Sequence, residues 1–371
     1  MNVTSNKRLL ALDVMRGITI AGMILVNNPG SWGYVYSPLK HAQWNGLTPT
    51  DLVFPFFMFI MGISTYISLR KYNFTFSTPA ALKIIKRTIV IFLIGIAINW
   101  FALLCYHHDP LPFAQIRILG VMQRLALCYG ASALIALLIK HKYIPYLIFV
   151  LLAGYFIILI TGNGFAYNET NILSIVDRSI LGDAHMYQDN HIDPEGLLST
   201  IPSIAHVLIG FCVGKLLMEV KDIREKLERL FLIGTILTFA GFLLSYGCPF
   251  NKKIWSPTFV LVTCGLGSSL LALLVWIIDI KGYKKWSRFF EPFGVNPLFI
   301  YVLADVLAIL LGVITVTCQG ESTSLQQAFY TNVLQPVFGN EGGSLAYAIL
   351  FVLLNWAIGY ILYKKKIYIK I

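Results

Sequence analysis

The sequence predicts an all-α polytopic membrane protein, a bundle of about ten transmembrane helices. Of its 371 residues, 57% are hydrophobic and only 13% are charged, and the mean hydropathy is +0.71, values that exclude an ordinary soluble domain. Apolar stretches long enough to cross a hydrocarbon core of about 30 Å recur along the chain. Backbone polar groups in lipid must be satisfied within the segment, and no alternating barrel strands are seen, so the predicted elements are helices.

The predicted spans are justified by their apolar runs, taken in chain order. They cover 9–28, 52–69, 88–105, 118–139, 144–161, 202–218, 229–247, 257–279, 295–316 and 345–363. The first follows two basic residues, as a signal peptide does, but it contains Asp13 and Arg16 and lacks a small-residue cleavage site. We therefore expect a retained helix. No soluble domain boundary and no internal repeat interrupts the pattern, so we expect one transmembrane domain over 1–371.

The distribution of basic residues predicts the orientation of the bundle. Positively charged loops stay cytoplasmic. One side of the predicted bundle holds 22 of the 29 Lys and Arg residues, in the segments 1–8, 70–87, 140–142, 215–229, 281–288 and 364–370. The opposite side holds Lys40, Arg117, Arg178, Lys252 and Lys253. Both termini are therefore predicted to be cytoplasmic, in the plasma (inner) membrane.

The same clusters explain the net charge of +11, which in a soluble protein would raise nucleic acid as a partner. Here it indicates topology and attraction to anionic membrane lipid, and we expect no nucleic-acid role. The six cysteines have no CxxC spacing, so neither a disulfide framework nor a metal site is expected.

The longest connection, 162–201, lies on the predicted outer side. It is polar and acidic, and loops of this kind are where a membrane protein would hold a polar partner. Its acidic residues are Glu169, Asp177, Asp183, Asp189, Asp193 and Glu195. We expect an outer-face loop within the single domain, because the segment is too short for a domain of its own.

Ionisable residues inside predicted spans are costly and usually face a cavity or a partner. Asp13 and Arg16 share one helix face, so they form either an ion pair or part of a ligand site. Arg124 lies about two turns into its helix, where facing a cavity is favoured over snorkelling to the interface. Asp51 follows Thr48-Pro49-Thr50 and is expected either to cap the second helix or to face a site.

His41 differs from the other histidines because it stands in a short polar and aromatic stretch between two spans. Asn27 ends the span before it, and Asp51 starts the span after it. Imidazole titrates near neutrality and suits general-base or nucleophilic work. The spacing alone leaves open both a catalytic histidine and a loop histidine that water satisfies.

Several motifs together resemble a known family. The sequence contains RLLALDVMRG at 8–17, VN at 26–27, KHAQWNGLTPTDLVFP at 40–55, FIMG at 59–62, RILGVMQR at 117–124, DPEGL at 193–197, NKKIWS at 251–256 and GVNP at 294–297. In this order they are similar to the catalytic region of the heparan-α-glucosaminide N-acetyltransferase family of transmembrane acyltransferases. The sequence shows no counterpart of the additional lumenal region and helix that precede this core in the lysosomal enzyme, so we expect a bacterial-type member.

The resemblance implies a multi-pass membrane transferase that moves an acetyl group from cytosolic acetyl-CoA, its co-substrate, to an amino sugar or glycan on the outer side. It matches His41 to the catalytic histidine, as base or acetyl carrier, and Asn27 to the asparagine that orients it. Asp51, Trp44, Asn45, Trp255 and Ser256 are then expected to bind the acceptor. Residues expected to bind acetyl-CoA are Arg124, Arg16, Asp13 and Asn296.

Other function classes remain open. A secondary transporter of a small polar or anionic solute also places charged residues in its spans, although the paired repeats and broken helices typical of transporters are not seen. A non-catalytic scaffold or lipid-binding protein would tolerate loss of His41. A homodimer is compatible with all of these.

Overall fold

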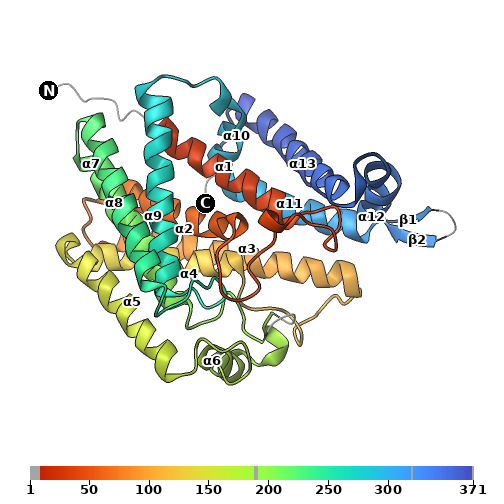
Figure 1. Ribbon diagram of the computed structural model, residues 1–371, viewed down its shortest axis with the longest axis horizontal. Coiled ribbons are helices and arrows are strands. Elements are labelled where there is room, and N and C mark those ends of the chain that lie inside the picture. The colour runs from red at the N-terminus through yellow and green to blue at the C-terminus, as the bar shows by residue number, and fades with distance from the viewer. Residues whose placement is uncertain (1–8, 188–190, 319–320, 370–371) are drawn as a thin grey trace.

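The predicted helical bundle is confirmed: the chain is an all-α, multi-pass membrane protein (Figure 1). The computed structural model describes residues 9–187, 191–318 and 321–369. Lys7, Arg8, Asp189 and Lys370, which enter the sequence analysis above, lie outside these ranges. Within them, nine helices are long and apolar enough to cross a membrane, and a tenth apolar helix, α11, is shorter.

The helices follow the predicted spans closely. Their bounds are α1 Leu10–Asn27, α2 Val53–Leu69, α3 Thr78–His107, α4 Val121–Leu138, α5 Ile144–Thr161, α7 Thr200–Glu219, α8 Ile223–Leu244, α9 Pro257–Leu274, α11 Pro297–Val313 and α13 Gln335–Lys364. α3 begins ten residues before its predicted start, with Pro79 in its first turn, where the missing N–H costs nothing. A π-helical turn, Val275–Ile280, continues α9.

Short elements lie in the connections, and they are not among the predicted apolar spans. They are α6 Ile172–Leu181, α10 Glu291–Val295, α12 Leu325–Phe329 and the antiparallel strands β1 Thr315–Cys318 and β2 Glu321–Ser324. The strands pair Thr315 with Ser324, and their hairpin projects from one end of the molecule (Figure 1). α6 lies within the predicted outer loop 162–201, so this connection is partly helical rather than a simple loop.

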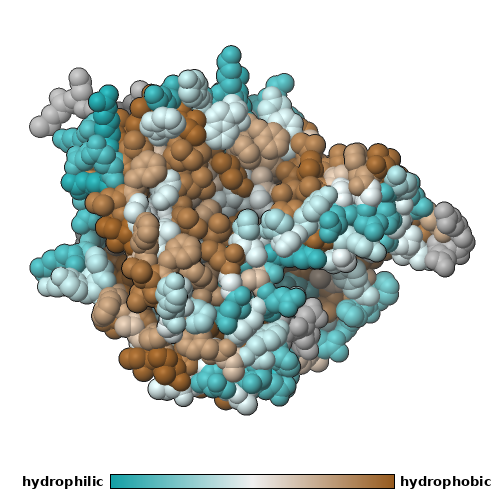
Figure 2. Space-filling model, in the orientation of Figure 1, coloured by the Kyte–Doolittle hydropathy of each residue, from teal (hydrophilic) through white to brown (hydrophobic). Residues whose placement is uncertain are grey.

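Burial separates the helices into an inner and an outer group. Most residues of α1, α2, α4, α7 and α9 are buried, whereas few residues of α3, α5 and α8 are. The exposed positions of α8 include Leu232, Ile236 and Phe239, as expected for a surface in contact with lipid. Figure 2 shows hydrophobic side chains over the middle of the helices, with hydrophilic ones toward the edges of the molecule.

Glycines allow a close contact between α2 and α7. A Cβ added at Gly62 of α2 would overlap the carbonyl oxygen of Val207 on α7, and one added at Gly210 would overlap that of Phe59. The small residues thus let the two backbones approach, as in many membrane helix pairs. This contact holds α2, which begins beside the site described below, in the centre of the bundle.

We expect Gly62→Ala to lower the thermal unfolding temperature, because the new methyl group forces α2 and α7 apart. Overpacking of this kind costs about 1–3 kcal/mol. Gly154→Ala on α5 is the matched control, since a Cβ there meets nothing within 4 Å. Equal unfolding temperatures of the two purified variants in detergent would contradict this account of the α2–α7 contact.

Candidate functional site

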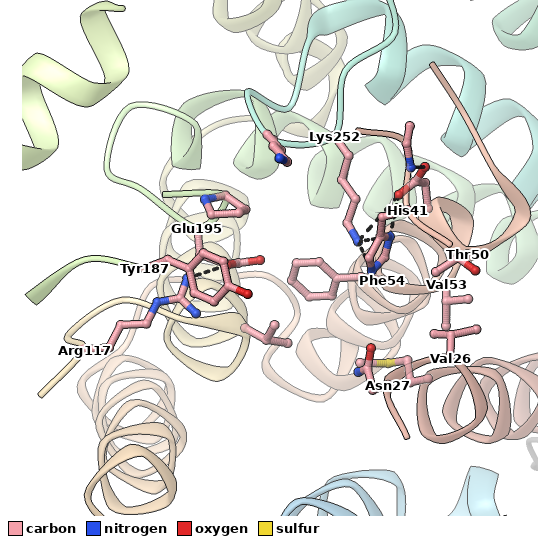
Figure 3. A pocket seen from close by; sticks show the side chains of 16 residues that line it. Val26, Asn27, His41, Thr50, Val53, Phe54, Arg117, Tyr187, Glu195 and Lys252 are labelled. Carbon is pink, nitrogen blue, oxygen red and sulfur yellow. Dashed lines mark hydrogen bonds and ion pairs between the residues drawn. The ribbon is translucent and has the colours of Figure 1, made fainter. Parts of the chain in front are cut away.

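A cavity of about 400 Å³ lies where α1, α2, the start of α4 and four connections meet. Its walls combine apolar side chains with a few charged ones (Figure 3). Its lining consists of Met23, Val26, Asn27, His41, Ala42, Thr50, Asp51, Val53, Phe54, Arg117, Val121, Tyr187, Pro194, Glu195, Lys252 and Lys253. An apolar pocket with a small number of convergent polar groups is typical of a ligand or active site.

His41 and Asp51 form a hydrogen-bonded pair on one wall. Nδ1 of His41 lies 2.7 Å from Oδ1 of Asp51, and the imidazole is 45% exposed while the carboxylate is buried. The other oxygen, Oδ2, accepts from the backbone N–H of Ala42 (3.1 Å) and from the N–H (3.1 Å) and hydroxyl (2.9 Å) of Thr48. Because the carboxylate can only accept, Nδ1 carries the imidazole proton, and the lone pair of the ring lies on Nε2.

Asp51 therefore both caps a helix and faces a site, the two alternatives that the sequence leaves open. Its bonds to Thr48 complete a capping box at the 3₁₀ turn Pro49–Leu52, which leads into α2. The local sequence thus fixes the carboxylate with one oxygen turned toward His41.

Lys252 reaches the His41 ring from the connection between α8 and α9 (Figure 3). Its Nζ lies 3.2 Å from Nδ1 and 3.5 Å from Nε2 of the imidazole, and 3.9 Å from Oδ1 of Asp51. Burial lowers the pKa of the Lys252 ammonium below its usual 10.5, and the carboxylates of Asp51 and Glu195 oppose that shift only in part.

The opposite wall holds Arg117 between two carboxylates. Nη2 of Arg117 lies 2.7 Å from Oδ1 of Asp193 and 2.7 Å from Oε2 of Glu195, and its guanidinium lies 4.7 Å from the centre of the Tyr187 ring. Burial alone would raise the pKa of Glu195, but the charges of Arg117 and Arg124 hold it below its ordinary value. These contacts tie Tyr187, Asp193 and Glu195 to the segment that leads into α4.

The structure brings some of the sequence-predicted residues together and separates others. Asn27, on the last turn of α1, is exposed and lines the cavity with His41 and Asp51. No hydrogen bond among the described residues joins Asn27 to His41. Trp44 turns away from the cavity, donating from Nε1 to the carbonyl of Phe165 at 2.9 Å. Asn45 accepts a hydrogen bond from Asn251 at 3.2 Å and is likewise absent from the lining.

Trp255 and Ser256 also lie outside the cavity lining. Trp255 is buried with φ of 51°, and its ring packs edge-on against Phe54 and Phe259 at centroid distances of 5.4 and 5.2 Å. The hydroxyl of Ser256 accepts from the N–H of Phe259 and of Asn251, so it caps α9 and closes the preceding turn. These contacts shape the connection that carries Lys252.

Of the four residues expected to bind acetyl-CoA, Arg16 alone lines a described cavity. This second cavity, of about 240 Å³, also contains Arg87 and Ser64. Arg16 forms an ion pair with Asp13 at 3.2 Å and donates to the carbonyl of Gly294 at 2.8 Å. Asp13 and Arg16 thus form an ion pair, and Arg16 also faces a cavity, so the ligand-site alternative stays a prediction.

Arg124 and Asn296 hold segments of the chain together. The Arg124 guanidinium is buried and donates to the carbonyls of Pro194, Gly196 and Ser199 and to the hydroxyls of Ser199 and Ser203. It neither lines the first cavity nor snorkels, but fastens α4 to residues 194–203. Asn296 bonds to backbone atoms of Ile367 and Ile369, near the C-terminus.

Sequence reasoning missed Lys252, Glu195, Arg117 and Tyr187 as cavity residues. Three of them stand in the motifs 117–124, 193–197 and 251–256, so a signal was present. Their motifs are separated by tens of residues, and no spacing rule says which side chains converge in space.

Comparisons with known proteins identify the family of this chain. A family model described as heparan-alpha-glucosaminide N-acetyltransferase, catalytic, matches residues 8–246. Human heparan-alpha-glucosaminide N-acetyltransferase is 31% identical over 365 residues, covering 81% of this chain and 53% of the human protein. The mouse protein of the same name is 29% identical over 370 residues, covering 82% and 54%. The chain spans about half the length of these curated relatives, and by these matches it belongs to the heparan-alpha-glucosaminide N-acetyltransferase family.

Proposed function

We propose that this chain is a membrane-embedded acetyltransferase that moves an acetyl group from cytosolic acetyl-CoA to an amino sugar or glycan on the outer side of the membrane. The observation that carries the proposal is the His41–Asp51 pair, 2.7 Å apart at the wall of a 400 Å³ cavity. The relatives named as N-acetyltransferases support the class of reaction.

His41 supplies the reactive nitrogen. Because Asp51 holds the proton on Nδ1, the lone pair of Nε2 is available either to take a proton from the attacking amine or to accept the acetyl group itself. Asp51 orients the ring and stabilises the imidazolium that forms, as the third group does in catalytic triads. Both routes, base and acetyl carrier, use the same nitrogen.

Asn27 acts on the substrate rather than on the ring. Nδ1 of His41 is already engaged by Asp51, so Asn27 is not needed to fix the tautomer. It lines the same cavity with an exposed amide. We infer that this amide polarises the acetyl carbonyl, since side-chain amides serve as donors to developing oxyanions.

The cavity wall opposite His41, which holds Arg117 and its carboxylate partners, has a charge that suits an acceptor with an amino group. Arg117 contributes one positive charge against the two carboxylates of Asp193 and Glu195, which leaves a net negative charge. An ammonium group is attracted to such a wall, and the neutral amine that it yields on losing a proton to water faces His41 on the opposite wall.

The second cavity suits the donor. Arg16 and Arg87 place two guanidinium groups there, which bind phosphates well. α1 borders both cavities, with Arg16 and Asn27 separated by eleven residues, or about 17 Å along the helix. A donor extended along α1 from the cytoplasmic side would bring its thioester to His41.

The charge count places Arg87 and the other basic segments on the cytoplasmic side, with both termini, in the plasma membrane. We expect sealed inside-out vesicles to acetylate glucosamine trapped in their lumen when acetyl-CoA is added outside, with the product detected by mass spectrometry. Right-side-out vesicles given external acetyl-CoA and external glucosamine are expected to be inactive. Activity only in the second arrangement would refute transfer across the membrane.

Cysteine labelling supplies the orientation control for these vesicles. Ser179→Cys on α6 should react with an impermeant thiol reagent in intact cells, and Lys221→Cys between α7 and α8 should not. Both positions are exposed, so reactivity reports the side of the membrane. The unaltered chain gives the background from its six native cysteines. The reverse pattern would overturn the orientation.

A further inference from the structure

Lys252 is held beside His41 by a connection with a defined shape. The backbone N–H of Gly46 donates to the carbonyl of Phe250 at 2.8 Å, and the Asn251 amide donates to Asn45 Oδ1 at 3.2 Å. Asn251 is fully buried, and its Oδ1 accepts from the N–H of Ile254. The segment before Lys252 is therefore bonded to the segment after His41, although the two lie some 200 residues apart.

Compensation of the charge of Asp51 does not account for a lysine at position 252. Both oxygens of this carboxylate are already bonded to donors, from His41, Ala42 and Thr48. Nζ of Lys252 lies 3.9 Å from Oδ1, too far for a hydrogen bond. Placing a cation in a cavity wall is costly, and here the cost is not offset by a direct bond to the carboxylate.

The ammonium group also has hydrogen-bonding capacity to spare. It carries three N–H donors. Among the described residues its hydrogen-bond contacts are to the two nitrogens of His41, and Nδ1 has its own proton directed at Asp51. Nε2 offers one lone pair, so at least two N–H groups remain for a molecule in the cavity that Lys252 lines.

We propose that Lys252 is a catalytic residue, and that its ammonium group donates hydrogen bonds to the acetyl oxygen as that oxygen becomes negative. The proposal rests on the acetyl transfer proposed above and adds a residue to it. The ammonium group lies against the imidazole, 3.2 Å from Nδ1 and 3.5 Å from Nε2, so it can reach the oxygen of a carbonyl whose carbon is attacked by Nε2 or by an amine beside it.

The step balances without any change in the protonation of Lys252. In direct transfer the amine nitrogen bonds to the acetyl carbon, the carbonyl electron pair moves to oxygen, and Nε2 takes the amine proton. The oxyanion then re-forms the carbonyl, the carbon–sulfur bond breaks, and the proton passes from Nε2 to sulfur.

If His41 carries the acetyl group, an Nε2–carbon bond forms as the carbon–sulfur bond breaks. The amine then displaces Nε2, and its proton ends on sulfur. The same oxygen becomes negative in each addition.

The test measures release of thiol from acetyl-CoA by the purified full-length chain, with glucosamine as acceptor. We expect Lys252→Met to lower kcat by about 100–1000-fold, the usual cost of losing an oxyanion donor, with little change in the acceptor KM. Lys40→Met is the matched control, because it removes an exposed lysine adjacent to His41, and it is expected to keep the normal rate. A folded Lys252→Met variant with a normal kcat would overturn the proposal.

Chemical rescue separates catalysis from folding. Lys252→Cys should be slow, and alkylation with bromoethylamine, which rebuilds an ammonium group at nearly the same reach, should restore at least about a tenth of the rate. The unaltered chain treated identically controls for modification of native cysteines. An alkylated variant that is folded and remains as slow as untreated Lys252→Cys would also refute the role.

The pH profile gives a readout that a purely structural lysine would not move. The charged groups near Lys252 are Asp51 and His41 on its own wall, Glu195 and Arg117 opposite, and its neighbour Lys253. Its pKa lies below 10.5, so kcat/KM should fall on the alkaline side with a midpoint below that value. Lys252→Arg keeps its charge and should extend activity to higher pH. An alkaline limb that is identical in both proteins would count against the ammonium.

The two proposals fail differently. If the unaltered chain and His41→Ala release thiol equally, the proposed function itself is wrong. If His41→Ala is inactive and Lys252→Met is normal, the acetyltransferase stands and only the role of Lys252 is wrong.

Discussion

His41→Ala is expected to reduce acetyl transfer by about 10²–10⁴-fold, the range typical of losing a general base, while the protein stays folded. The imidazole is 45% exposed, so its removal leaves no buried void. Its loss deprives the cavity of the Nε2 lone pair, for which no neighbouring side chain substitutes: Asp51 is buried and saturated, and Lys252 is a cation. Product formation should be measured together with thermal unfolding in detergent.

His206→Ala provides the contrast for His41→Ala. His206 is fully buried in α7, and its Nε2 bonds to the carbonyl of Pro55 at 2.9 Å. Its loss should lower the unfolding temperature more than it lowers the turnover of the protein that remains folded. A His41→Ala enzyme that retained a substantial fraction of the normal rate would show that the catalytic nitrogen lies elsewhere.

The largest effect on stability is expected for Arg124→Met. Its guanidinium satisfies carbonyl and hydroxyl oxygens of the segment 194–203, and the truncation leaves these acceptors buried without donors. Breaking a buried charged network by removing one partner costs about 3–5 kcal/mol. We expect a corresponding fall in the unfolding temperature, measured in detergent by intrinsic fluorescence.

Arg178→Met is the matched control for Arg124→Met. Arg178 pairs at the surface with the well-exposed carboxylates of Glu169 and Asp183, so its loss should change stability little. If Arg124→Met instead raised the KM for acetyl-CoA and unfolded normally, Arg124 would belong to donor binding, as its position within a span first suggests.

The transmembrane helices can be predicted from the sequence because lipid imposes a strong rule on composition and length. The predicted spans for α1, α2, α5 and α8 begin and end within a few residues of the observed helices, except that α8 begins six residues before its predicted start. α6 and the β1–β2 hairpin cannot be predicted in this way. The hairpin residues are mostly polar, and α6 is amphipathic but too short to span a membrane, and it makes distant contacts such as the bond from the N–H of Leu197 to Asp177.

The candidate site, too, can be predicted from the sequence only in part. Asn27, His41 and Asp51 lie within 25 residues of one another, so chain proximity brings them to one cavity. Trp44 and Asn45 stand equally near in sequence, but they bond to Phe165 and Asn251 in distant connections. Only the three-dimensional structure shows which polar side chains face the cavity and which ones hold its walls together.

The bonds around His41 differ in range, and this difference has a consequence for biosynthesis. Every hydrogen bond of the Asp51 carboxylate joins residues within ten positions of each other in the chain. The hydrogen bonds of Gly46 and Asn45, by contrast, are to Phe250 and Asn251. A chain that leaves the ribosome N-terminus first can close the early bonds long before α8 and α9 have been translated. A chain that ended before residue 250 could thus form the His41–Asp51 pair but would lack Lys252. The site is thus complete only after the connection between α8 and α9 has been translated.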